Sequence, residues 1–97
     1  LVEQLHFDKA FMGTMGFTVE YGMTTTDPAE AYTKRLVMQR AQQVVLLADS
    51  SKFGHGGFVA FGTLAEVTVV VTDSAVAPGH VRQCEKAGVE VVQVGEE

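Results

Sequence analysis

The sequence predicts an α/β fold, in which a mostly parallel sheet is flanked by helices. Val-rich runs at residues 43–48, 67–72 and 89–94 indicate three strands. The first two runs are nearly continuous in apolar side chains, which is typical of parallel strands that are buried on both faces. Helical signals precede and separate the runs, so right-handed crossovers are expected between the strands.

The first predicted helix spans residues 28 to about 42. Asp27 precedes Pro28, and Glu30 lies three residues after Asp27. This pattern is similar to a capping box, because both carboxylates can accept hydrogen bonds from free amides in the first turn of a helix. The side chains expected close to its apolar stripe are Tyr32, Leu36 and Val37, and those expected in water are Lys34, Arg35 and Arg40.

A second helix is predicted from 78 to 87, because Gly88 can adopt the left-handed conformation that ends helices. The remaining segments give weaker signals. They are expected to form a short, loose start over 1–8, a strand that ends near Gly13, and a glycine-rich connection over 49–66 with one short strand near 58–61.

Length and charge exclude several classes of protein. With 97 residues, the chain is expected to form one domain over 1–97. Seven Lys and Arg against twelve Asp and Glu give a net charge of −5, so this chain by itself lacks the basic surface that grips DNA. No apolar run approaches the roughly 20 residues of a membrane span, and the start shows no secretory pattern. We therefore expect a cytoplasmic protein without a membrane partner.

The Cys and His residues offer no cluster with the spacing of zinc ligands, so no metal and no cofactor is expected. Cys84 has no spaced His or Asp partner and is interpreted as a partly buried structural thiol. The glycine run at 54–57 lacks the Lys-Ser/Thr ending of a Walker A loop, which favours a flexible loop. The first residue is Leu1 rather than Met, as expected of a piece of a longer protein.

Three loops are predicted to lie at one edge of the sheet. Residues 13–16, 49–52 and 72–74 each follow a predicted strand, and ligands bind to open parallel sheets outside the carboxyl ends of the strands. The loop at 49–52 is the most specific, because a buried strand leads into Asp49, two serines and Lys52. The lysine is a candidate contact for a phosphate or sugar oxygen. The alternative is a solvated turn whose carboxylate and first hydroxyl only cap local backbone groups.

A second candidate anion site lies at residues 22–27, a loop with one glycine and three threonines that leads into the helix at Pro28. Hydroxyls and free amides at a helix N-terminus can hold a phosphate. The alternative is a plain capped helix start, which Asp27 and Glu30 explain without a ligand. These carboxylates also weaken an anion site, because they occupy the positive end of the helix dipole.

Five short motifs follow one another along the chain, namely FMGTMGF at 11–17, GMTT at 22–25, EAYTKR at 30–35, LADSSKFG at 47–54 and VTD at 71–73. In this order they resemble the C-terminal, effector-sensing half of DeoR-family transcriptional regulators, over roughly residues 7–94. Such regulators join an N-terminal helix-turn-helix to a sensor related in fold to ribose-5-phosphate isomerases and CoA transferases. The resemblance implies that a phosphorylated sugar or sugar-derived metabolite binds and changes operator binding.

The resemblance also implies which residues contact the ligand. Lys52 matches a lysine that contacts substrate in the related isomerases, and the loops at 13–16 and 22–25 match loops that flank the sugar. Glu30 lies near the position of the catalytic glutamate of the isomerases. Met15 replaces an aspartate of the isomerases, so the resemblance implies that the ligand binds without being converted. No catalytic residue is therefore expected. The predicted ligand-binding residues are Gly13, Thr14, Gly16, Gly22, Thr24, Thr25, Glu30, Asp49, Ser51 and Lys52.

Three functions follow from these observations. The first is the sugar-phosphate sensor of a regulator, a repressor of sugar metabolism genes, which contacts DNA only through a helix-turn-helix that is not in this chain. The second is a fragment of a sugar-phosphate isomerase, with Glu30 as base and Lys52 as electrostatic partner. The third is an oligomerisation module whose loops bind nothing. The family's first strand would lie upstream of Leu1 and leave a sheet edge open, so a homo-oligomer is expected.

Overall fold

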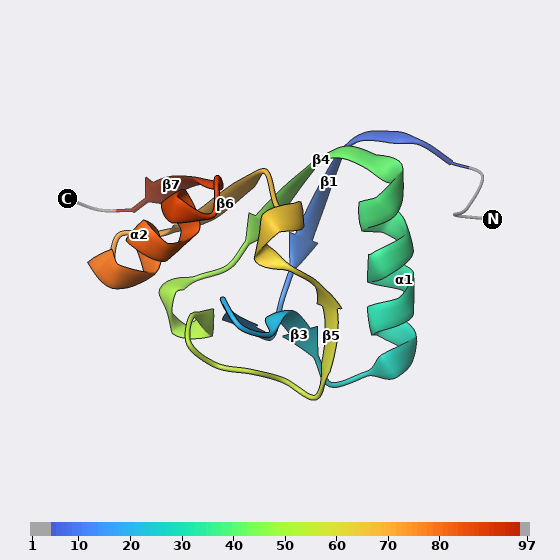
Figure 1. The fold of residues 1–97 in the computed structure, drawn as a ribbon, viewed down its shortest axis with the longest axis horizontal. Coiled ribbons are helices and arrows are strands. Elements are labelled where there is room, and N and C mark those ends of the chain that lie inside the picture. Colours follow the sequence, from blue (N-terminus) through green and yellow to red (C-terminus); the bar gives the residue numbers. More distant parts are fainter. Residues whose placement is uncertain (1–4, 96–97) are drawn as a thin grey trace.

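A computed structural model of the protein describes residues 5–95 and shows two sheets and two helices there (Figure 1). One sheet has four parallel strands and the other has three antiparallel strands. The predicted α/β fold is therefore confirmed. The elements are β1 (Phe7–Gly13), β2 (Gly16–Thr18), β3 (Gly22–Thr25), α1 (Pro28–Arg40), β4 (Ala41–Leu47), the 3-10 turn η2 (Ser50–Lys52), β5 (Val59–Gly62), the 3-10 turn η3 (Leu64–Glu66), β6 (Val69–Asp73), α2 (Pro78–Lys86) and β7 (Glu90–Val94).

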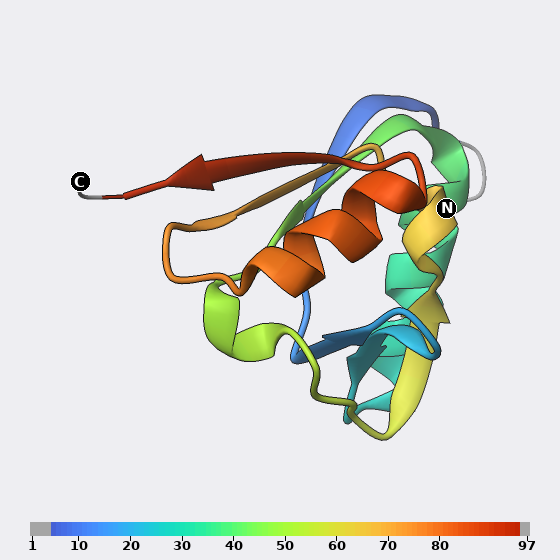
Figure 2. The ribbon, with the colours of Figure 1, turned by 60° about the vertical axis from the view of Figure 1, so that its left-hand side comes forward.

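The four-stranded sheet has the order β1-β4-β6-β7, so the chain advances across it in one direction. Right-handed crossovers that all advance in one direction place every connection on the same face. Figure 2 shows this arrangement, with α1, α2 and the shorter sheet all beneath the four strands. Leu46 on the covered face is fully buried, whereas Leu47 on the opposite face is 47% exposed. Val45, two residues before Leu47 on the same face, is buried, so the expected burial on both faces holds for the centre of β4 and not for its end.

The open face of this sheet carries a band of apolar side chains. The strand register places Phe11 opposite Val45, and Leu47 opposite Val71, so these residues share one face. The large apolar side chains that are exposed there are Phe11, Leu47, Val92 and Val94. Such a contiguous apolar surface favours burial against a further layer of protein.

Of the three-stranded sheet, the sequence predicted only β5, as the short strand near 58–61, and missed β2 and β3. The central strand β3 begins at Gly22, whose φ of 77° favours glycine, and all four of its residues are buried. The predicted loop at 22–25 is therefore a strand. The segment at 54–58 crosses this sheet closely, because a Cβ on Gly57 would lie 2.9 Å from the hydroxyl oxygen of Thr24. Gly57 thus allows this segment to pack on β3, and the predicted loop at 54–57 is present as an irregular, exposed segment.

The cap of α1 confirms half of the predicted capping box. Asp27 accepts a hydrogen bond from the amide of Ala29 at 3.0 Å, as an N-cap residue does. Glu30 does not complete the box, because its carboxylate accepts a hydrogen bond from the hydroxyl of Thr25 instead. The helix ends at Arg40, two residues before the predicted end, and β4 follows without a loop.

The buried stripe of α1 agrees with the predicted one in part, because Val37 packs against the core and Leu36 is half-buried. Tyr32 is 63% exposed, and the buried side chains are those of Ala31 and Met38. The sequence places Lys34 in water, but only 21% of its side chain is exposed in the structure. The helix packs on β1 and β5 through small and flexible residues, and a large aromatic side chain stays outside.

The remaining predictions concern the two ends of the chain. Gly88 has a φ of 87°, which confirms the predicted end of α2, and Cys84 on the inner side of α2 is buried as expected. Burial raises the pKa of the Cys84 thiol, and the charge of Glu85 adds to this effect. The loose start is wrong for residues 7 and 8, which belong to β1, and residues 1–4 lie outside the described part. Neither helix is long and apolar enough to span a membrane.

Candidate functional site

The predicted loops meet at the carboxyl edge of the four-stranded sheet. Gly13 at the end of β1 lies opposite Leu47 of β4, and Leu47 lies opposite Val71 of β6. The loops that follow these strands therefore start side by side, as predicted. This edge is where open parallel sheets bind their ligands.

The loop after β4 is held by two carboxylates. Asp49 accepts hydrogen bonds from the hydroxyl and from the amide of Ser51, and both contacts lower the pKa of the Asp49 carboxyl. Asp73, at the end of β6, accepts from the amides of Ser50 at 2.9 Å and Ala75 at 2.8 Å, which lower the pKa of Asp73. Asp49 therefore caps η2, as the solvated-turn alternative describes.

Lys52 is the last residue of this turn. Its side chain is partly buried, and its ammonium has no hydrogen-bond or ion-pair partner among residues 5–95. An ammonium group has three donors. The ammonium of Lys52 is therefore available to an anionic or hydroxylated ligand. The hydroxyl of Ser51 is not available as a donor, because it already donates to Asp49.

Threonine hydroxyls fix the turn between β1 and β2 against β3. The hydroxyl of Thr14 donates to the carbonyl of Gly16 at 2.6 Å and accepts from the amide of Thr24 at 3.2 Å. The hydroxyl of Thr24 donates to the same carbonyl at 3.3 Å and accepts from the amide of Gly57 at 2.5 Å. Thr14 and Thr24 are both buried. Their hydroxyls are therefore engaged in hydrogen bonds that hold the turn against β3.

A second polar network joins this turn to the first turns of α1. Thr25 is fully buried, and its hydroxyl donates to Oε1 of Glu30 at 2.5 Å. The other carboxylate oxygen of Glu30 lies 3.9 Å from Nζ of Lys34. Lys34 Nζ donates to the carbonyl of Gly13 at 2.9 Å and lies 4.8 Å from the ring centroid of Phe61. Sequence reasoning missed Lys34, and the one signal that pointed to it is its spacing of four residues from Glu30.

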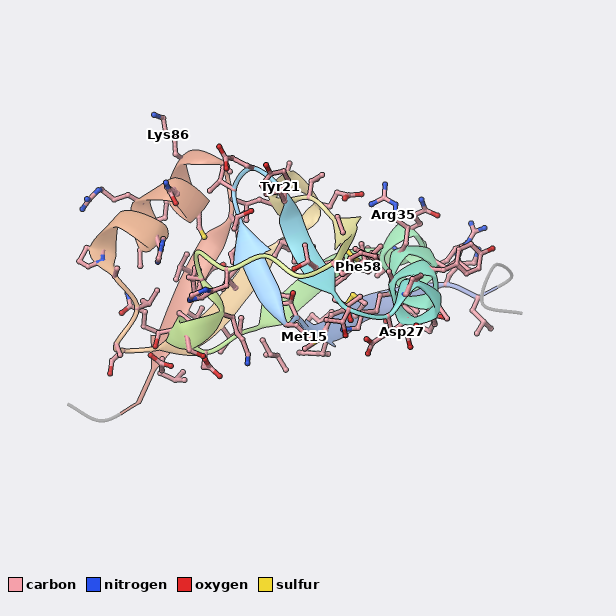
Figure 3. The ribbon with its side chains drawn as sticks, turned by 90° about the horizontal axis from the view of Figure 1, so that it is seen from below. Met15, Tyr21, Asp27, Arg35, Phe58 and Lys86 are labelled. Atoms are coloured by element: carbon pink, nitrogen blue, oxygen red, sulfur yellow. The ribbon has the colours of Figure 1, made fainter. Side chains whose placement is uncertain are left out.

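The structure brings nine of the ten predicted residues to this edge in two groups. One group surrounds the ends of β1 and β3, and the other forms η2. Gly22 lies at the opposite end of β3 from Thr25, where a Cβ would be 2.0 Å from the carbonyl oxygen of Gly62. Its role there is close packing. Met15 projects at the tip of the turn, on the same side of the molecule as Asp27, and Lys86 lies far from both (Figure 3).

A cavity of about 420 Å³ lies elsewhere, between the β2–β3 hairpin and α2, and contains none of the ten residues. The ring of His80 stacks on that of Phe53, with centroids 5.3 Å apart, and Phe17 meets Phe53 edge-on. Among the described residues that line it, Glu20 is the one acidic side chain and none is Lys or Arg. The cavity is thus poorly suited to a phosphorylated ligand. Within residues 5–95, no three His, Cys, Asp or Glu side chains gather as a metal site requires.

Comparison with known proteins supports the family resemblance that the order of the motifs indicated. The family model described as the DeoR C terminal sensor domain matches residues 1–74. The transcriptional regulator GlpR of Haloferax volcanii is 41% identical over 91 residues, which are 94% of this chain and 36% of that protein. The transcriptional repressor GlcR of Bacillus subtilis is 33% identical over 90% of this chain and 33% of its own length. The lactose phosphotransferase system repressor of Streptococcus mutans is 37% identical over 75% of this chain and 29% of its own.

The chain spans about a third of the length of these relatives. The matched residues 1–74 include all ten predicted site residues and the strands β1 to β6. These relatives are regulators and repressors by name, and the family is one of regulatory sensor domains, so the isomerase alternative is not supported. The chain belongs to the family of DeoR C-terminal sensor domains.

Proposed function

We propose that this chain is the effector-sensing part of a regulator, a repressor of sugar metabolism genes, and that the effector is a phosphorylated sugar. The observation that carries the proposal is the ammonium of Lys52 at the carboxyl edge of the sheet, which has no hydrogen-bond or ion-pair partner among residues 5–95. A lysine ammonium binds phosphate oxygens by charge-assisted hydrogen bonds. Beside it, the turn at 13–16 is fixed by buried threonines and can act as a rigid wall.

The other end of the ligand would meet Glu30. Its carboxylate is partly exposed and accepts from one buried hydroxyl, so it retains lone pairs for the hydroxyl groups of a sugar. Met15 projects where the related isomerases carry an aspartate and cannot accept a proton or a strong hydrogen bond. This combination supports binding without turnover.

Effector binding would reach DNA through a separate helix-turn-helix, because this chain has a net charge of −5. A ligand shifts such a regulator only by binding one of its conformations better than the other. A protein that acts on operators works where the DNA is, which in bacteria and archaea is the cytoplasm. The residues at 1–97 form the sensing unit in this proposal, and no cofactor is needed for it.

The proposal includes a homo-oligomer, in which a second copy covers the open face of the sheet. Phe11 and Leu47 are exposed there beside the unpaired edge of β1. Sedimentation velocity at about 50 μM, in the range of weak dimers, should show a dimer or larger species, and Leu47→Asp should shift it to monomer. A monomeric wild type at that concentration would contradict this part.

Thermal unfolding with candidate effectors tests the sugar-phosphate site. A ligand that binds only the folded state raises Tm by mass action. We expect at least one of glucose 6-phosphate, fructose 6-phosphate and glycerol 3-phosphate to raise Tm, and Lys52→Met to weaken binding about tenfold or more, the loss of one charge-assisted hydrogen bond. Lys86→Met is the control, because Lys86 is exposed on α2 far from the site (Figure 3). Equal binding by both variants would contradict the proposal.

A further inference from the structure

Lys34 links two elements that lie far apart in the sequence. Its ammonium donates to the carbonyl of Gly13, 21 residues away, at 2.9 Å. The contact with Glu30 on its own helix is longer, at 3.9 Å. The shorter contact is therefore the hydrogen bond to Gly13, which joins α1 to the end of β1. Lys34 does more than form an ion pair within its own helix.

Burial gives this contact its strength. Only 21% of the Lys34 side chain is exposed, and its ammonium lies above the ring of Phe61. A charged group in such a place must be paired, because its desolvation is costly. Without Lys34, the Gly13 carbonyl would lose its side-chain donor at the very point where β1 ends and the turn at 13–16 begins.

The next residue of α1 provides a natural comparison. Arg35 also donates from the helix to a backbone carbonyl, that of Phe61, at 3.3 Å, and pairs with the carboxylate of Glu66 at 3.0 Å. The two cations thus make the same kinds of contact. They differ in place, because Arg35 holds η3 and the end of β5, whereas Lys34 holds the site.

We infer that Lys34 is a positioning residue of the effector site. It fixes the turn at 13–16 relative to the first turn of α1. Glu30 and the turn are therefore already in place when the ligand binds. This inference rests on the proposed function for its ligand. Its structural half, the hold on the turn, does not depend on any ligand.

Hydrogen exchange tests that half in the ligand-free protein. The amide of Met15 donates to the carbonyl of Thr24 at 3.1 Å and reports on the turn, and the amide of the fully buried Val70 reports on global unfolding. We expect Lys34→Met to speed exchange at Met15 about tenfold relative to Val70, the equivalent of one lost hydrogen bond. Lys34→Arg should restore most of the protection. Arg35→Met should leave Met15 unchanged.

Affinity for the sugar phosphate that raises Tm most tests the other half. Lys34→Met should weaken binding about tenfold and Arg35→Met less than twofold. Unchanged exchange at Met15 in Lys34→Met would overturn the inference, and weaker binding without faster exchange would make Lys34 a direct contact instead. If no sugar phosphate binds the wild type, the proposed function fails, and the exchange data still decide whether Lys34 holds the turn.

Discussion

The two halves of the candidate site use their polar groups in opposite ways. In the hairpin half, the hydroxyls of Thr14, Thr24 and Thr25 are all bonded within the protein. In the η2 half, carboxylates hold the backbone, and the ammonium of Lys52 has no partner within residues 5–95. Polar residues at a site thus divide into those that build it and those that remain for a ligand. Hydrogen bonding within the protein, rather than residue type or burial, separates the two, because Asp49 and Ser51 are exposed and are still bonded to each other.

The largest effect on stability is expected at Gly16, in the hairpin half of the site. A Cβ at this position would lie 2.3 Å from the carbonyl oxygen of His55, which is backbone and cannot rotate away. We expect Gly16→Ala to destabilise the protein by about 3 kcal/mol, measured by urea unfolding. Gly13→Ala is the matched control, because a Cβ there meets no atom within 4 Å. Equal stability of the two variants would show that the segment at 54–58 does not pack as described.

A smaller effect is expected from Thr24→Val, which keeps the shape of the side chain and removes its hydroxyl. The amide of Gly57 and the carbonyl of Gly16 each lose a partner. We expect a loss of about 1 to 2 kcal/mol in unfolding free energy, with ligand affinity changed far less than by Lys52→Met. Unchanged stability together with lost affinity would move Thr24 to the ligand-facing group.

The free energy of unfolding at acid pH tests the role of Asp73 in the η2 half of the site. Hydrogen bonds from the amides of Ser50 and Ala75 lower the pKa of Asp73 in the folded state. Its contribution is therefore present at neutral pH and is lost as pH falls below the ordinary Asp value of about 3.9 and through the lowered folded pKa. Asp73→Ala should be less stable than wild type at pH 7, and the difference should shrink toward pH 2. A difference that does not change with pH would contradict this account.

Much of the four-stranded sheet could be predicted, because buried parallel strands leave long apolar runs in the sequence. The runs at 67–72 and 89–94 correspond to β6 and β7 within two residues. The cap at Asp27 and the end of α2 at Gly88 were predictable for the same reason, since each is a local signal. The edge at which the loops meet follows from the strand directions alone.

Of the three-stranded sheet, only β5 was predicted, as the short strand near 58–61, and its pairing with β2 and β3 was not. The strands of this sheet are three or four residues long, too short for a period to show, and its polar threonines are buried by contacts that form only in three dimensions. Lys34 was missed because its partner Gly13 lies 21 residues away. The number of threonines at 22–27 predicts a phosphate-binding loop. In the structure, the hydroxyls of Thr24 and Thr25 form hydrogen bonds within the protein, and the sequence alone does not show these partners.

A nitrogen-15 titration with the sugar phosphate, followed by amide chemical-shift changes, shows directly where the ligand binds. We expect the largest changes at residues 13–16, Glu30 and 50–52, along the carboxyl edge of the sheet, and we expect Lys52→Met to remove them. Changes confined to Phe17, His80 and Cys84 would place the ligand in the cavity beneath α2 and contradict the account.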